Sequence, residues 1–205
     1  MIEKKKKEII SFGKLIYDKG YNASIDGNIS VRLSDTEILI TASGTRLGFL
    51  TPDDLVITDY DGKLIKGSHR PSSETILHTG IYKERPDVNA VIHAHAPNSV
   101  ALSMLDIDIE NNLYAAMAPI PITEFAVPST EESYEQMKPF IKKYNWGILR
   151  RHGVVTWEKD LLATFLRLEG MEHFAKIMMS ALAVTNVKPL PDNDKNRLLK
   201  SWGLL

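Results

Sequence analysis

Two histidines, His93 and His95, stand one residue apart in the apolar segment NAVIHAHAPNSV, residues 89–100. In a β-strand alternate side chains point to the same face, so these two residues would lie about 6 to 7 Å apart at Cα. Two imidazoles at that separation can bind one metal ion. A single histidine on an apolar strand is more often a packed core residue, and spacing alone leaves that alternative open.

A third histidine, His152, stands beside a glycine at the end of the strand-like run WGILRRHGVV. The chain has no cysteine, so any metal site in it uses histidine, carboxylate and water. Three histidines that leave a fourth position free are typical of catalytic zinc, whereas structural zinc sites rely on thiolates. The remaining histidines, His69, His78 and His173, are interpreted as surface or packing residues.

Small polar residues recur where predicted strands and helices meet. The tripeptide SSE, which ends in Glu74, opens a predicted helix, and helix N-termini favour anions such as phosphate. Helix capping is the alternative explanation for these residues. Two loops, DGNIS and TASGT, contain Asn28, Ser43 and Gly44, which either donate to a phosphate or simply form turns.

The first half of the chain predicts one helix, two hairpins and a second helix. Ile9, Phe12 and Ile16 recur at helical spacing and predict an amphipathic helix over residues 3–19. GNISVRL with EILIT predicts one hairpin, and LVITDYDGKLI predicts another around an Asp-Gly turn. PSSETILHTGIYKERP then predicts a helix with serines at its N-cap, directly before the strand VNAVIHAH.

The second half predicts further helices around another hairpin. APNSVALSML and NNLYAAMA each predict a short helix, and STEESYEQMKPFIKKY predicts one with a capping box at Ser129 and Thr130. Pro139 is expected to end or kink that helix. WGILRR and VVTW predict strands on either side of a turn at His152, before a long helix that begins at about Glu158.

Helices that alternate with hairpin strands predict an α/β protein of the α+β type. We expect three layers, αβα, with a central mixed, largely antiparallel sheet flanked by helices. The sequence contains no internal repeat or linker, so residues 1–205 are expected to form a single domain. The polar segment at about 186–205 is expected to be a tail that either docks on a neighbour or frays.

Composition excludes several classes of protein. The chain has 205 residues, of which 43% are hydrophobic and 25% charged, as in ordinary globular proteins. A formal net charge of -1 lacks the basic footprint of nucleic-acid binders. No window approaches the ~18 apolar residues of a membrane span, and the N-terminus does not resemble a signal peptide. We therefore expect a cytoplasmic protein with no nucleic-acid or membrane partner.

Five motifs in order, GNISVR, ITASGT, PSSE…H, AVIHAHAP and RHGVV, resemble the class II aldolase and adducin family. This family includes L-fuculose-1-phosphate aldolase and ribulose-5-phosphate 4-epimerase, and the resemblance spans roughly residues 5 to 182. It implies one Zn²⁺, or another divalent metal, per subunit, held by His93, His95 and His152. Glu74 matches a glutamate that ligates the resting metal and serves as acid and base once substrate displaces it.

The same resemblance implies a phosphate site and an assembly. The residues that match phosphate-binding positions are Asn28, Ser43, Gly44, Ser72 and Ser73, although fuculose aldolases often have threonine where this chain has Ser43. Tyr114, in NNLYAAMA, matches a catalytic tyrosine that reaches the active site of an adjacent subunit in a homotetramer. The residues that flank Tyr114 differ from the family pattern.

The activity implied is a zinc-dependent lyase for a small sugar phosphate. It would cleave a ketose 1-phosphate, such as L-fuculose 1-phosphate, by a retro-aldol reaction to dihydroxyacetone phosphate and an aldehyde. The first alternative is methylthioribulose-1-phosphate dehydratase, which RRHGVVTW resembles. Pentulose-5-phosphate 4-epimerase ranks next, because it uses a C-terminal tyrosine and none follows Tyr144 here. A non-catalytic sugar-phosphate binding domain is the last alternative, and the presence of Glu74 argues against it.

Overall fold

Seven strands form one sheet in the computed structural model, which describes residues 2–105, 120–188 and 190–201. The strand order is β4-β3-β2-β1-β5-β7-β6, and every neighbouring pair is antiparallel. One isolated parallel bridge joins Ile122 to Ile148. The strands are β1 (Asn28–Arg32), β2 (Glu37–Thr41), β3 (Leu55–Asp59), β4 (Leu64–Lys66), β5 (Ala90–Ala94), β6 (Trp146–Leu149) and β7 (Gly153–Glu158).

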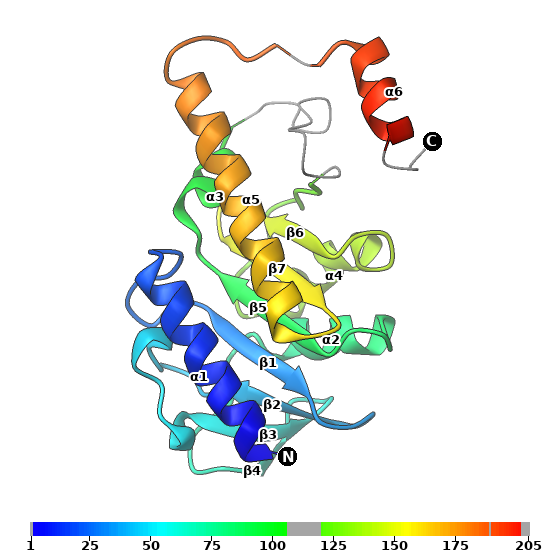
Figure 1. Ribbon diagram of the computed structural model, residues 1–205. Helices are drawn as coiled ribbons and strands as arrows, with labels where there is room; N and C mark the ends of the chain where they lie inside the picture. Colours follow the sequence, from blue (N-terminus) through cyan, green and yellow to red (C-terminus); the bar gives the residue numbers. More distant parts are fainter. Residues whose placement is uncertain (1, 106–119, 189, 202–205) are drawn as a thin grey trace.

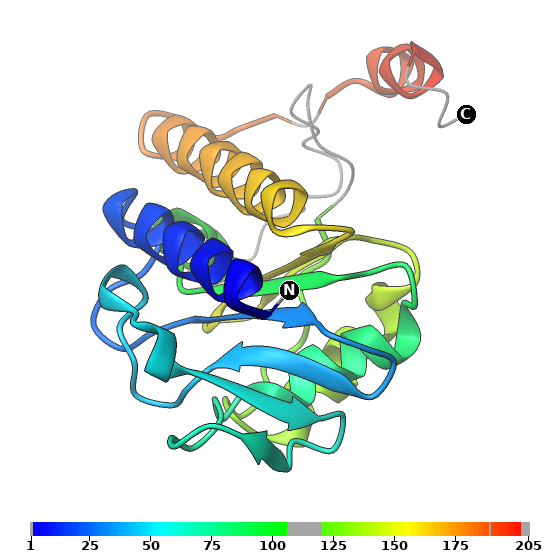
Figure 2. The same cartoon turned by 60° about the horizontal axis from the view of Figure 1, so that its bottom comes forward.

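Helices cover both faces of this sheet, which confirms the three-layer prediction (Figure 1, Figure 2). One face packs against α1 (Ile2–Asp18), α3 (Pro97–Leu102) and α5 (Leu161–Leu182). The other face packs against α2 (Thr75–Glu84) and α4 (Glu131–Ile141). Figure 2 shows α1 and α5 together above the sheet, with α2 beneath it. Two 3-10 turns, η1 (Leu47–Phe49) and η2 (Pro52–Asp54), connect β2 to β3.

Alternation along β5 decides which side of the sheet receives the metal-binding candidates. Ala90, Ile92 and Ala94 belong to the core under α1 and α5. Val91 belongs to the opposite core under α2 and α4. Because side chains alternate along a strand, His93 points to the α2 side.

The start of α2 differs from the prediction that serines occupy its N-cap. Glu74 occupies the N-cap position and makes no side-chain capping bond. Ser72 instead forms a turn before the helix, in which its Oγ accepts from the Glu74 N–H at 3.3 Å. The Thr75 hydroxyl donates to the Ser72 carbonyl at 2.6 Å. The turn holds the Glu74 backbone just outside the first helical residue.

The helix α4 corrects the predicted capping box and continues past Pro139. Thr130 is its N-cap but makes no side-chain bond to the helix, because its hydroxyl donates to the Val127 carbonyl at 2.7 Å. The expected capping box is therefore absent. Pro139 does not end the helix, which continues to Ile141. A proline so close to the end removes only one backbone donor from the last turn.

The hairpin of β6 and β7 and the helix α5 have slightly different bounds from those predicted. The turn comprises residues 150–152, and Arg151 adopts a left-handed φ of 60°. Strand β7 then runs to Glu158, so α5 begins at Leu161. Its N-cap is Asp160, whose carboxylate accepts from the Ala163 N–H at 2.7 Å. The capping carboxylate explains why the helix begins three residues later than expected.

The C-terminal segment, which was predicted to be a tail, contains a short helix. The helix α6 (Asp192–Ser201) buries no side chain and lies apart from the sheet in both views (Figure 1, Figure 2). The helix predicted for NNLYAAMA lies outside the described residues. Within the described part of the chain, no helix is long and apolar enough to cross a membrane.

Candidate metal and phosphate site

Three histidines meet where the end of β5 lies beside the turn between β6 and β7. One ring nitrogen from each of His93, His95 and His152 can be chosen so that all three lie within 4.8 Å of one another. Their ring centroids are 4.8 to 5.0 Å apart. The Nε2 atoms of His93 and His95 are only 3.1 Å apart. The fold therefore brings together the two neighbouring histidines and a third that is 57 residues further along.

A hydrogen bond orients the His93 ring, and a carboxylate lies beside the His95 ring. The Nδ1–H of His93 donates to the Val154 carbonyl at 3.0 Å, which leaves the Nε2 lone pair facing the cluster. The Nδ1 of His95 lies 3.6 Å from the Asp26 carboxylate. The His95 backbone N–H donates to the side-chain oxygen of Asn22 at 2.7 Å. Carbonyl and carboxylate partners of this kind set the tautomer of metal-binding histidines.

Burial favours the neutral form of the three imidazoles. It lowers the pKa of His93 well below the usual value, and repulsion from His152 and His95 lowers it further. Burial also lowers the pKa of His95 and of His152, and the nearby Asp26 carboxylate opposes both shifts. Neutral imidazole is the form that binds a metal, so the cluster is ready for one without the loss of a proton.

The donor set fits a divalent metal. The Nδ1 of His152 is buried and has no hydrogen-bond partner in the described part of the chain. Nitrogen lone pairs that converge in this way repel one another unless a cation lies between them. Three histidines without thiolate leave a coordination position for water or substrate, as catalytic sites do.

Glu74 lines the same cavity, although it does not belong to the group of ligand atoms within 4.8 Å. It is 5% exposed, and its Oε1 accepts from the Ser129 hydroxyl at 2.9 Å. Its Oε2 is buried without a partner among the described residues. Burial raises the pKa of Glu74, and the Ser129 hydrogen bonds oppose that rise. A carboxyl group in this state can exchange a proton nearer to neutral pH.

The cavity has a volume of about 290 Å³ and gathers residues from several loops. Ser73 and Ser129 join their hydroxyls across it at 2.8 Å. Gly44 adopts a φ of 76°, a conformation that favours glycine. Nine of the ten predicted site residues line this cavity: Asn28, Ser43, Gly44, Ser72, Ser73, Glu74, His93, His95 and His152. The tenth, Tyr114, lies outside the described residues.

Four residues near the histidine cluster and Glu74 were not predicted to belong to the site. Asp26 and Asn22 hold His95, and Ser129 holds Glu74. A Cβ on Gly27 would lie 2.8 Å from the His93 carbonyl, so the loop before β1 passes directly against strand β5. The motif DGNIS contains Asp26 and Gly27, but nothing in its composition shows that they face a histidine. The capping pattern at Ser129 concealed its contact with Glu74.

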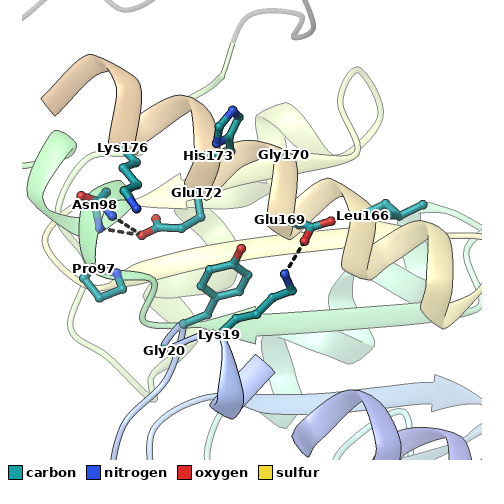
Figure 3. A pocket seen from close by; sticks show the side chains of 11 residues that line it. Lys19, Gly20, Pro97, Asn98, Leu166, Glu169, Gly170, Glu172, His173 and Lys176 are labelled. Atoms are coloured by element: carbon teal, nitrogen blue, oxygen red, sulfur yellow. Dashed lines mark hydrogen bonds and ion pairs between the residues drawn. The ribbon is translucent and has the colours of Figure 1, made fainter. Parts of the chain in front are cut away.

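A larger cavity, of about 660 Å³, lies under α5 and contains none of the predicted site residues (Figure 3). Figure 3 shows Lys19 pointing to Glu169, with which it pairs at 2.8 Å. Glu172 points to Asn98 and accepts from its backbone and side chain at 2.9 and 2.7 Å. These carboxylates join α5 to its neighbours, so they serve packing in this structure.

A sequence model of the Class II Aldolase and Adducin N-terminal domain matches residues 7–179. The chain belongs to this family. Class II aldolases are metal-dependent lyase-type enzymes, and the histidine cluster is consistent with that dependence.

Relatives of this family member carry different activities in their names. The chain is 35% identical over 188 residues to L-fuculose phosphate aldolase of Methanocaldococcus jannaschii, across 87% of this chain and 98% of that one. It is 30% identical over 197 residues to methylthioribulose-1-phosphate dehydratase of Pseudomonas savastanoi pv. phaseolicola, across 87% and 96%. A solved L-fuculose 1-phosphate aldolase superposes with a TM-score of 0.85 at 27% identity, across 97% and 95%.

Proposed function

We propose that this class II aldolase is a zinc-dependent lyase that cleaves a ketose 1-phosphate, such as L-fuculose 1-phosphate. The products are dihydroxyacetone phosphate and an aldehyde. The observation that carries the proposal is the placement of three histidines and a buried carboxyl group around one cavity. A single small substrate that reaches both groups fits a volume of about 290 Å³.

His93, His95 and His152 would hold the zinc ion. When bound, zinc supplies a Lewis acid that stabilises negative charge on the substrate's oxygens. Neutral imidazoles leave the full charge of the ion available. The hydrogen bond from His93 to Val154 and the Asp26 carboxylate beside His95 would fix the rings in ligating orientation.

Glu74 would move the proton at C3 of the substrate. In the cleavage Tyr114 of a neighbouring subunit would take the proton of the C4 hydroxyl, the C3–C4 bond would break, and its electron pair would enter the C2–C3 enediolate. The Glu74 carboxyl group then delivers a proton to C3. Its burial and its raised pKa suit this exchange.

Five residues would bind the substrate phosphate, namely Asn28, Ser43, Gly44, Ser72 and Ser73. All five line the cavity, and between them they have hydroxyl, amide and backbone N–H groups that can donate to a phosphate. Binding at the phosphate would align C3 and C4 with the Glu74 carboxyl group.

A second candidate is methylthioribulose-1-phosphate dehydratase, because a relative of that name covers 87% of this chain. Both reactions would use a metal site and a proton-transferring carboxyl group. They differ in the bond that breaks, since the dehydratase eliminates water and keeps the carbon chain intact. The proposed aldolase activity therefore depends on product analysis.

A substrate panel tests the proposal. The zinc-loaded protein is incubated with L-fuculose 1-phosphate, other ketose 1-phosphates, methylthioribulose 1-phosphate and a pentulose 5-phosphate. We expect release of dihydroxyacetone phosphate, measured by its enzymatic reduction with NADH, and release about 10² to 10⁴-fold slower with Glu74→Gln. Water loss from methylthioribulose 1-phosphate without dihydroxyacetone phosphate would favour the dehydratase. Metal binding without turnover of any compound would identify a binding domain.

A further inference from the structure

Four buried side chains form a continuous line of hydrogen bonds from the core to the cavity. The Tyr82 hydroxyl lies 2.8 Å from Ser30 Oγ, which lies 2.7 Å from Nδ1 of His78. The other ring nitrogen of His78, Nε2, lies 2.6 Å from the side-chain oxygen of Asn28. Tyr82, Ser30 and His78 are at most 1% exposed, and Asn28 lines the cavity.

The direction of each hydrogen bond in this line follows from its ends. The amide oxygen of Asn28 can only accept, so Nε2 of His78 carries the hydrogen. In a neutral ring Nδ1 then accepts, and Ser30 must donate to it. The single hydrogen of Ser30 is then used, so the Tyr82 hydroxyl donates to Ser30.

The opposite orientation of Asn28 is disfavoured by the same line. If the amide turned by 180°, its nitrogen would donate to Nε2, and His78 would carry its hydrogen on Nδ1. Ser30 would then accept from His78 and would need a new acceptor for its own hydrogen. If every bond in the line reversed, Ser30 would donate to Tyr82, and the Tyr82 hydroxyl could no longer donate to Ser30. Its hydrogen would then lack an acceptor in this line, and an unmade buried hydrogen bond costs about 1 to 3 kcal/mol.

We propose that His78, held by Ser30 and Tyr82, is a positioning residue that turns the amide nitrogen of Asn28 toward the cavity as a donor to the substrate phosphate. The proposal rests on the proposed function, because it concerns the phosphate site. Within the described residues no protein acceptor takes a hydrogen bond from that nitrogen, so the hydrogen atoms of the amide remain for a ligand. A reversed amide would present its oxygen to the phosphate and repel it.

Burial of His78 keeps the line in one protonation state. It lowers the pKa of His78 to about 3, so the ring is neutral at working pH. A neutral ring has one hydrogen, and its tautomer decides which end of the Asn28 amide faces the cavity. The orientation of the Asn28 amide is therefore set by residues of α2 and β1, which lie behind the loops that would contact the phosphate.

The first experiment reads the tautomer without any assay of activity. Nitrogen-15 NMR of the zinc-loaded protein distinguishes the two tautomers of a neutral histidine, and comparison with His78→Gln assigns the signal. We expect the Nε2–H tautomer for His78 in the parent. The Nδ1–H tautomer would overturn the proposal.

The second experiment measures binding of inorganic phosphate to the zinc-loaded protein by calorimetry. Asn28→Ala removes the donor, and Ser30→Ala removes the oxygen that fixes His78. We expect both variants to bind phosphate about tenfold more weakly or worse, with unchanged zinc content. The matched control is Thr58→Val, which removes another buried hydroxyl, one without a partner among the described residues, and should bind phosphate as the parent does.

The outcomes separate this proposal from the proposed function. Phosphate binding that survives Ser30→Ala, or that is unaffected by Asn28→Ala, would overturn the positioning role even where the parent cleaves ketose 1-phosphates. A parent that binds phosphate with the expected variant effects but turns over no sugar phosphate would retain the positioning role and refute the lyase. If Ser30→Ala does not fold, Tyr82→Phe takes its place and should weaken phosphate binding in the same direction.

Discussion

The histidine cluster is the feature of this protein that single substitutions test most directly. His93→Ala, His95→Ala and His152→Ala each remove one of the converging nitrogens. We expect each to lower bound zinc, measured by mass spectrometry, from about one ion per chain toward none, and to abolish turnover. Thermal unfolding should show that the fold persists. The exposed His69 provides the control, because His69→Ala should keep both metal and turnover. If His93→Ala, His95→Ala or His152→Ala kept both, the substituted histidine would not be a metal ligand.

Glu74 separates proton transfer from metal binding. Glu74→Gln preserves the size of the side chain but cannot exchange a proton, so we expect turnover to fall about 10² to 10⁴-fold while zinc is retained. Steady-state kinetics and metal analysis on the same preparation check this. Glu131→Gln, at the exposed start of α4, should leave turnover unchanged. Activity of Glu74→Gln within severalfold of the parent would reduce Glu74 to its place at the start of α2.

Stability should depend on pH through His78. Its pKa is about 3 in the folded protein and about 6.5 when unfolded, so the unfolded chain binds the extra proton first as pH falls. The stabilisation is complete above about pH 6.5 and is lost as pH falls from there toward about 3. Between pH 7 and pH 5 we expect His78 to contribute a loss of about 2 kcal/mol in unfolding free energy.

Chemical denaturation of the metal-free protein at both pH values measures this loss. His78→Gln is the comparison, since it removes the titrating ring and should show a pH dependence weaker by about that amount. An identical pH dependence in parent and variant would mean that His78 is not the group responsible.

At the scale of elements, α3 depends on a carboxylate from another helix. Glu172 of α5 is buried and accepts from the backbone N–H groups of Asn98 and Ser99, both at 2.9 Å. Their side chains add two bonds at 2.7 Å. The four bonds hold the start of α3, which begins two residues after His95. Glu172→Gln replaces an acceptor by a donor and should cost about 2 to 3 kcal/mol.

Thermal unfolding should then show a midpoint lowered by about 4 to 12 °C for Glu172→Gln. Glu169→Gln, one turn earlier in the same helix, is the control. Its pair with Lys19 is partly exposed, so its loss should lower the unfolding midpoint much less than Glu172→Gln does. Equal effects of the two substitutions would refute the special role of Glu172.

For the whole molecule, we expect a homotetramer in which Tyr114 of one subunit completes the site of the next. A ring of identical head-to-tail contacts would present every Tyr114 to a neighbouring metal. Inactive Tyr114→Phe and inactive His93→Ala subunits, mixed after dissociation and reassembly, should regain part of the activity, because some interfaces pair an intact histidine set with an intact tyrosine. Absence of recovery despite proven subunit exchange, or an active monomer, would contradict this assembly.

The sequence by itself determined the elements whose patterns are local. Apolar spacing in residues 3–19 predicted α1, and the Asp-Gly turn predicted the β3–β4 hairpin; both are confirmed. Family motifs assigned the chain correctly, and alternation along β5 placed His93, whereas His95 lies just beyond the end of that strand. These features depend on neighbours within a few residues, which is the range over which backbone preferences and side-chain periodicity act.

Only the tertiary structure decided which residues meet across long separations. Ser129 received a local explanation as a cap, yet its hydroxyl bonds Glu74 from 55 positions away. His78 was interpreted as a surface or packing residue, and it is buried between Ser30 and Asn28 on β1. Asp26 reaches His95 because β1 pairs with β5. Local patterns cannot encode such contacts, since strand order and helix packing are set by burial of the whole core.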